Sequence, residues 1–128
     1  MLETSDMEEP LFLCDSAELI DGGKGIRFSV TASGEDRTAF AIRYGNEAHA
    51  YLNRCAHVPM ELDWTPGEFF ESSGLYLMCA THGALYEPDT GRCAGGPCHG
   101  GRLHKIRVVE QGDKVYWQPD DLVRPAVA

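Results

Sequence analysis

The sequence lacks a long hydrophobic run and a basic leader segment. No apolar stretch approaches the roughly 20 residues that a helix needs to cross a bilayer. The first ten residues carry four acidic side chains and no basic one, unlike the charged and apolar regions of a secretory signal peptide. We therefore expect a cytoplasmic protein without membrane contacts.

Basic residues are in short supply across the whole chain. Eleven lysines and arginines stand against 20 aspartates and glutamates, so the formal net charge is −9. Phosphate backbones and anionic lipid surfaces repel such a chain, which makes nucleic acid and membranes poor candidates for partners. The same charge suits docking onto a basic protein surface, and it serves solubility equally well.

Cysteine and histidine are scarce, at five residues each. An odd cysteine count argues against a framework of disulfides, and in a reducing compartment cysteines are more often metal ligands or free thiols. We expect Cys14 to be a buried small hydrophobe, and Cys93 and Cys98 to be structural or free thiols rather than a redox pair. Three histidines show no ligand spacing and are expected to be surface or strand residues: His49, His99 and His104.

No amphipathic pattern persists long enough to predict a long helix, whereas strand-like alternation recurs. At 128 residues the chain is most simply one domain. Ile26 to Thr31 alternates apolar and polar residues, as a half-buried strand does. Two hairpins are expected, pairing 38–44 with 47–53 across Gly45-Asn46, and 106–110 with 114–117. The sequence therefore predicts a small all-β domain.

The ends of the chain differ from this patterned middle. Residues 1–10 are expected to be a flexible acidic N-terminus, and residues 118–128 a proline-containing C-terminal tail. The domain would then span 11–117, with a short turn near Ser16. Between the two hairpins lies a long excursion, about 54–101, whose motif suggests its chemistry.

This excursion carries four potential metal ligands in two short loops. Cys55 and His57 are two residues apart, and Cys79 and His82 are three apart. Residues i and i+2 of an extended loop point to one side, and Gly83 gives backbone room beside the second pair. Two thiolates and two imidazoles suit a single tetrahedral Zn²⁺. They equally suit a [2Fe–2S] cluster whose irons take one kind of ligand each.

The order Cys-x-His followed by Cys-x-x-His resembles the Rieske [2Fe–2S] signature rather than a zinc finger, whose order is Cys, Cys, His, His. The resemblance extends through Asn53-Arg-Cys-Ala-His57 and Cys79-Ala-Thr-His-Gly-Ala-Leu-Tyr-Glu-Pro-Asp-Thr-Gly-Arg-Cys93 to Gly95-Gly-Pro97. With the flanking strands it covers roughly residues 11–117.

The resemblance implies a fold of stacked antiparallel sheets with an inserted cluster-binding subdomain, about 54–101. By position, Cys55 and Cys79 would hold the buried iron of a Rieske [2Fe–2S] cluster. His57 and His82 would then hold the outer iron. The neighbours of the cluster would be Gly83, Tyr86 and Pro97.

The departures from the family are informative. Membrane-complex members join the ligand loops by a disulfide at positions that are Met60 and Thr81 here, and they place a serine donor where Ala84 stands. The tyrosine donor is kept as Tyr86. Because hydrogen bonds to cluster sulfur raise the potential, we expect a midpoint below that of the membrane type. The interval 58–78 is long, and its aromatic side chains are expected to pack the subdomain rather than to form a docking patch: Trp64, Phe69 and Phe70.

The function that the resemblance implies is one-electron transfer. A catalytic Rieske oxygenase also needs a separate iron site of two histidines and a carboxylate, for which this chain has no room. We therefore expect an electron carrier without its own substrate chemistry, a soluble Rieske-type ferredoxin between a reductase and an oxygenase or other acceptor. Two alternatives stay open: a small subunit of a larger redox enzyme such as a nitrite reductase, and a structural Zn²⁺ interaction domain. These motifs specify neither the partners nor the oligomeric state.

Overall fold

The computed structural model describes residues 10–54, 61–63, 65, 67–79, 83–98, 100–120 and 122–125. A 3-10 helix at Ser16–Glu18 fills the place where a short turn was expected. The strands in this part of the chain are β1 (Leu11–Asp15), β2 (Ile26–Ala32), β3 (Glu35–Tyr44), β4 (Glu47–Leu52), β5 (Leu77–Met78), β6 (Leu85–Tyr86), β7 (Cys93–Gly95), β8 (Lys105–Ile106), β9 (Val108–Gln111), β10 (Lys114–Trp117) and β11 (Val123–Pro125).

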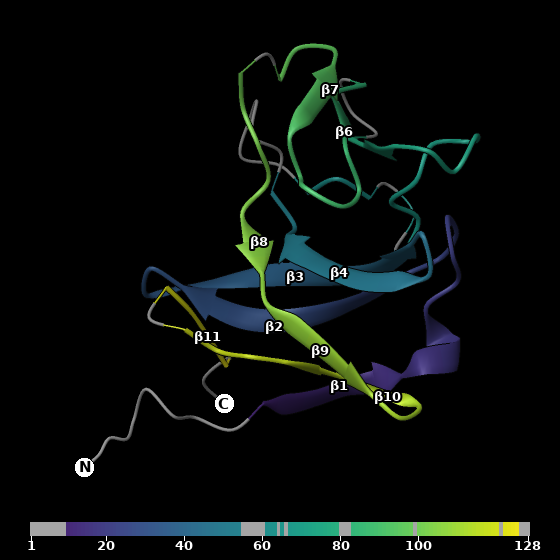
Figure 1. Ribbon diagram of the computed structural model, residues 1–128. Helices are drawn as coiled ribbons and strands as arrows, with labels where there is room; N and C mark the ends of the chain where they lie inside the picture. Colours follow the sequence, from purple (N-terminus) through teal and green to yellow (C-terminus); the bar gives the residue numbers. More distant parts are fainter. Residues whose placement is uncertain are drawn as a thin grey trace.

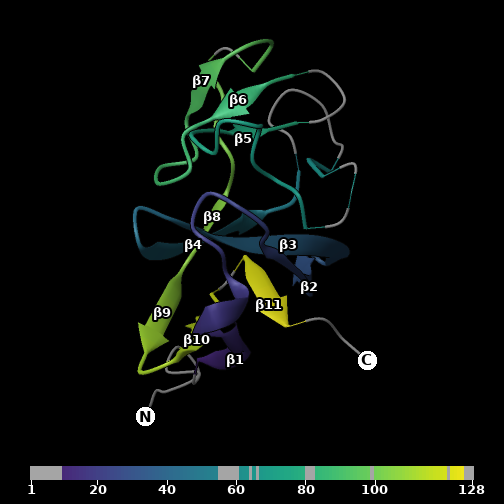
Figure 2. The same ribbon diagram turned by 90° about the vertical axis from the view of Figure 1, so that its right-hand side faces the viewer.

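The strands form three antiparallel sheets, which lie one above another in Figure 1. A five-stranded sheet in the order β11-β2-β3-β4-β8 occupies the middle. Below it lies the sheet β1-β10-β9, and above it the small sheet β5-β6-β7. Figure 2 shows the same three levels after a quarter turn. The predicted all-β fold of stacked antiparallel sheets is confirmed.

Two-residue turns build the long hairpins of the middle sheet. Gly45 and Asn46 have φ of 60° and 69°, and Ser33 and Gly34 have φ of 52° and 80°. Positive φ at both central positions is typical of a type I′ turn, whose twist matches that of the flanking strands. The predicted hairpin across Gly45-Asn46 is therefore confirmed, with Tyr44 opposite Glu47.

The other predicted hairpin is more complex than its sequence indicated. Val108–Gln111 and Lys114–Trp117 do pair as β9 and β10. The residues just before them form β8, which pairs with β4 in the middle sheet. The chain thus changes sheets at Arg107, and one expected strand becomes two.

The middle sheet is covered on both faces. Ala39, Phe40, Ala41 and Ile42 of β3 are all 0% exposed, because successive strand residues face opposite sides and each side has a neighbour. Phe40 and Ile42 pack with the small sheet and its loops. Ala39 and Ala41 pack toward the sheet of β1, β9 and β10. The small sheet and its loops therefore rest directly on β3.

Cys14 lies in the core between the two larger sheets, at 2% exposure. Burial, with the nearby Glu18 carboxylate as a smaller cause, raises the pKa of its thiol to about 11. It is therefore an uncharged, buried side chain, as the sequence predicted.

The C-terminal segment corrects an expectation. Val123–Pro125, expected to lie in a tail, forms β11 and pairs with β2. The Asp120 carboxylate accepts hydrogen bonds from the backbone N–H groups of Leu122 and Val123 and starts the strand. A three-residue strand is too short to show alternation, which is why its sequence gave no signal.

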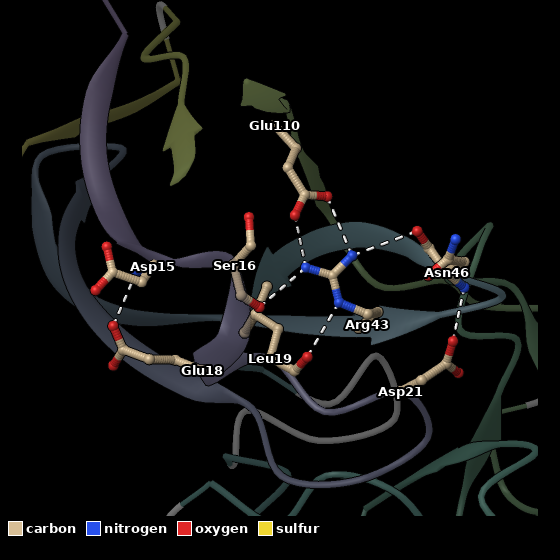
Figure 3. A network of polar contacts seen from close by, with 8 residues as sticks. All are labelled: Asp15, Ser16, Glu18, Leu19, Asp21, Arg43, Asn46 and Glu110. Atoms are coloured by element: carbon tan, nitrogen blue, oxygen red, sulfur yellow. Dashed lines mark hydrogen bonds and ion pairs between the residues drawn. The ribbon is translucent and has the colours of Figure 1, made fainter. Parts of the chain in front are cut away.

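Arg43 ties the middle sheet to the sheet below it (Figure 3). Its guanidinium makes a bidentate contact with Glu110 of β9, at 2.7 and 3.1 Å. It also donates to the carbonyl oxygens of Ser16 and Leu19, at 3.1 and 3.0 Å. Because the arginine fork satisfies all of these acceptors at once, it fixes β3, β9 and the 3-10 helix relative to each other.

This contact predicts an acid-sensitive contribution to stability. Hydrogen bonding to Arg43 lowers the pKa of Glu110 below its ordinary value of 4.5. The contribution is therefore complete above pH 4.5 and is lost as the pH falls through the folded-state pKa. We expect Glu110→Gln to lower the free energy of unfolding at neutral pH, with a difference from wild type that shrinks in acid. Urea unfolding across the pH range measures this, and a difference independent of pH would contradict it.

Candidate metal centre

The described residues include one of the four predicted ligands, Cys79. Cys55, His57 and His82 lie outside them, as do Met60 and Thr81. Within the described part of the chain, no three metal-ligating side chains gather into a site. The centre is therefore defined by the segments that lead into and out of the two ligand loops.

The second ligand loop is closed by two backbone hydrogen bonds. Cys79 N–H donates to the carbonyl oxygen of Ala84 at 2.9 Å, and Gly83 N–H donates to that of Cys79 at 2.8 Å. Cys79 is 0% exposed, whereas Gly83 is exposed. Gly83 has a φ of 74°, which the absence of a Cβ permits. The loop thus starts at a buried thiol and returns at the surface, as the predicted tight turn requires.

Tyr86 lies on the same face of the small sheet as the buried end of that loop. Ala84 and Tyr86 are two residues apart and are both 0% exposed, so they point to one side, while Leu85 between them is half-buried. Cys79, Ala84 and Tyr86 belong to one core cluster. Tyr86 therefore lies in the same core as Cys79, and its position beside the cluster stays a prediction.

The third loop, Gly95-Gly96-Pro97, lies against the second ligand loop. Gly96 has a φ of 83°, and a Cβ on it would lie 2.9 Å from the carbonyl oxygen of Gly83 and 3.1 Å from the Cα of Ala84. The two backbones therefore touch directly. Pro97 is exposed at the end of this loop, and its position beside the cluster stays a prediction.

Sequence comparison agrees with this geometry. A family model described as the Rieske [2Fe-2S] domain matches residues 9–115. The chain belongs to the Rieske [2Fe–2S] family. The cofactor of this domain is accordingly a Rieske [2Fe–2S] cluster. Two thiolates and two imidazoles are the donors that it requires, and the buried Cys79 at the base of a closed loop fits a ligand of the inner iron.

Solved structures with the Rieske fold are similar to this domain. The ferredoxin of carbazole 1,9a-dioxygenase from Nocardioides aromaticivorans is 21% identical, with a TM-score of 0.66 over 88% of this chain and 100% of that chain. A quaternary ammonium Rieske monooxygenase is 17% identical, with a TM-score of 0.67 over 89% of this chain and 32% of that chain. A search among curated proteins finds no match. No helix in the described residues of this Rieske domain is long and apolar enough to span a membrane.

Cys93 and Cys98 of the Rieske domain correct another expectation. They were expected to be structural or free thiols in a compartment that disfavours disulfides, yet they form a disulfide. β7 and the turn after it bring their Cα atoms to 5.7 Å, within the range that a disulfide can bridge. The bond encloses Ala94 to Pro97 and therefore constrains the third loop, which lies against the second ligand loop.

Removing this disulfide should destabilise the Rieske domain moderately. For so short a closed loop, the chain-entropy model gives about 2 kcal/mol. We expect Cys93→Ala/Cys98→Ala to lower the free energy of unfolding in urea by that amount. Dithiothreitol should lower the wild-type value similarly and leave the variant unchanged. A wild-type chain insensitive to dithiothreitol would show that the thiols are not bridged.

Two aromatic side chains of the long interval, Phe69 and Phe70, pack against the middle sheet. Phe69 is 1% exposed and stacks on Phe40, with 4.0 Å between ring centroids. Phe70 packs against Tyr44, at 6.3 Å. The prediction that Phe69 and Phe70 pack the subdomain is confirmed, whereas Trp64 lies outside the described residues.

Two of the histidines without ligand spacing lie on a strand or at the surface, as predicted. His49 is on β4 at 9% exposure, and His104 is exposed. Burial, and then the nearby Lys105 cation, lowers the pKa of His49, so it is neutral at neutral pH. His99 lies outside the described residues.

Sequence reasoning missed two polar side chains at the first ligand loop. Asn53 is 4% exposed, and Asp63 is 8% exposed with a fully buried side chain. They are hydrogen-bonded to each other at 2.9 Å. The signal available was an asparagine two residues before the first ligand. Nothing in the sequence paired it with Asp63.

Proposed function

We propose that this Rieske domain is a soluble electron carrier of the ferredoxin type, working in the cytoplasm. Cys55 and Cys79 would hold the inner iron of its cluster, and His57 and His82 the outer iron. The observation that carries the proposal is the course of the second ligand loop, from the fully buried Cys79 to the exposed Gly83. This course keeps Cys79 in the core and brings the chain to the surface at Gly83, the residue that follows His82 in the sequence.

The bound cluster supplies a site that takes up and releases one electron. The residues of this chain determine where that electron is exchanged. The core around Cys79 excludes water and partner proteins from the inner side. The exposed Gly83 and Pro97 border the side that stays open to a partner. Exchange would therefore occur at the tip of the small sheet, the end farthest from β1 in Figure 1.

The partners that we propose are a reductase and an oxygenase or another acceptor. Another similar structure is a complex of reduced oxygenase and oxidized ferredoxin in carbazole 1,9a-dioxygenase, with 22% identity and a TM-score of 0.63 over 84% of this chain and 91% of that chain. A net charge of −9 favours docking onto a basic surface, and the rate of that encounter falls with salt.

An electron-transfer assay tests the proposed function. The purified chain is placed between an NADH-dependent flavoprotein reductase and cytochrome c, a basic one-electron acceptor. We expect cytochrome c reduction to increase with the concentration of the chain and to slow as salt is added. Reduction at the rate of the reductase alone would contradict the proposal.

A second candidate is a Rieske-like small subunit of a larger redox enzyme. It is favoured by the monooxygenase match, in which this fold accounts for 32% of a longer chain. Native purification separates the two proposals. A free carrier would elute alone, whereas a subunit would co-purify with its enzyme at a fixed ratio.

Tyr86 should raise the midpoint potential of the cluster by donating a hydrogen bond to it. Tyr86→Phe removes that donor, and a hydrogen bond worth about 1.4 kcal/mol more in the reduced state corresponds to about 60 mV for one electron. We expect the midpoint to fall by about that much in a dye-coupled titration. Ala84→Ser should raise the midpoint by adding a hydroxyl donor. An unchanged midpoint in Tyr86→Phe, or a lowered one in Ala84→Ser, would contradict this role.

A further inference from the structure

The chain before the first ligand loop is joined to the chain after it by a buried polar contact. Asn53 Nδ2 donates to Asp63 Oδ1 at 2.9 Å, and the backbone N–H of Leu62 donates to Asn53 Oδ1 at 2.8 Å. Because a backbone N–H must meet an oxygen, the Leu62 bond also fixes which way the Asn53 amide faces. We call this pair of side chains the Asn53–Asp63 clamp.

Asp63 connects the clamp to the middle sheet. Its Oδ2 accepts the backbone N–H of Gly67 at 3.0 Å and lies 3.6 Å from Nε of Arg27 on β2. Gly67 is itself fixed, since its carbonyl oxygen accepts the N–H of Gly25 at 2.9 Å. The second end of the loop is therefore held by contacts that do not involve the ligands.

The first end of the loop is held just as firmly. The backbone N–H of Asn53 donates to the carbonyl oxygen of Thr38 on β3, at 2.8 Å. Leu62, beside the clamp, is 0% exposed in the core under the small sheet. The segment 54–61 thus leaves from and returns to one fixed point.

Burying an asparagine–carboxylate pair costs desolvation free energy, which offsets much of the stability that the contact adds. Both groups lose hydration, and each must recover it through hydrogen bonds of good geometry. A well-packed apolar pair would stabilise the fold equally well, so what a polar pair adds is a defined geometry. A segment whose ends are fixed also loses less conformational freedom when its side chains bind a ligand.

We propose that the Asn53–Asp63 clamp positions the first ligand loop, holding Cys55 and His57 ready for the cluster. Asn53 and Asp63 are positioning residues, which act through the backbone of the loop. This inference rests on the ligand assignment made under Proposed function. The proposal also assigns a role to the long interval after the first loop, because that interval supplies Leu62, Asp63 and Gly67.

Iron release to a chelator tests the clamp below the unfolding temperature of every variant. Asn53→Ala and Asp63→Ala should each release iron about 10-fold faster than wild type, as loss of a group that supports a metal ligand does. The double variant should release it no faster than the quicker single one, because the two side chains act as a unit. The matched control is Val115→Ala, which removes a fully buried side chain from the core on the other side of the middle sheet.

Electron paramagnetic resonance of the reduced proteins gives a second readout. The Asn53→Ala signal should be broadened or shifted by loosely held ligands, and the Val115→Ala signal should match wild type. Should Asn53→Ala fail to fold, Asp63→Asn serves in its place, since it keeps Oδ1 for Asn53 and loses the contacts of Oδ2. We expect its iron release to be faster than that of Val115→Ala.

The outcomes separate the two proposals. Clamp variants that release iron no faster than Val115→Ala, with an unchanged spectrum, would overturn the positioning role alone. A wild-type chain that binds no [2Fe–2S] cluster would instead overturn the ligand assignment, and the proposed function with it.

Discussion

Replacing Cys79 with alanine should abolish cluster binding entirely. The side chain is fully buried at the closed base of the second ligand loop, where we propose that it holds the inner iron. An iron that loses one of its two protein thiolates is not held. We expect no iron, no acid-labile sulfide and no visible absorption in Cys79→Ala. Chemical analysis of the purified variant measures this.

Cys14→Ala is the matched control for that experiment. Cys14 is also buried, at 2% exposure, but it lies in the core between the two larger sheets. Its raised pKa, about 11, keeps the thiol protonated and unsuited to metal binding. This variant should retain the wild-type iron content. Equal loss of iron in both variants would mean that Cys79 acts through folding rather than as a ligand.

Gly96→Ala should have the largest effect on stability of any glycine substitution beside the metal centre. The new Cβ would lie 2.9 Å from the carbonyl oxygen of Gly83. The φ of Gly96 is 83°, which residues with a side chain rarely adopt. Left-handed strain and forced separation of two backbones together cost about 2–5 kcal/mol. Because the displaced backbone belongs to the second ligand loop, iron retention should fall as well. Urea unfolding and iron analysis measure the two effects.

Gly112→Ala separates backbone strain from crowding. Gly112 lies in the β9–β10 turn with a φ of 61°, and a Cβ there meets nothing within 4 Å. The strain alone should cost about 1–2 kcal/mol and leave the iron content unchanged. If Gly96→Ala were no more destabilising than this control, the third loop would not be packed against the ligand loop as the structure has it.

The features that were predictable from the sequence depend on residues that lie close together along the chain. The order and spacing of Cys55, His57, Cys79 and His82 indicated the family before any fold was considered. The hairpin across Gly45-Asn46 was predictable for the same reason, because a type I′ turn is specified by two adjacent residues.

The parts that sequence reasoning missed depend on contacts across space. Asn53 and Asp63 are hydrogen-bonded only in the folded chain, and no local sequence pattern indicates that they are partners. The disulfide between Cys93 and Cys98 requires the turn after β7 to bring the two Cα atoms together. β11 is recognisable as a strand only by its pairing with β2. In each case the tertiary fold decides what a short segment does.

The most direct test of the whole account is the low-temperature electron paramagnetic resonance spectrum of the reduced protein, read beside its metal content. The account predicts a rhombic Rieske-type signal from a protein with two irons and two acid-labile sulfides per chain. A colourless protein with one zinc, no iron and no such signal would contradict it.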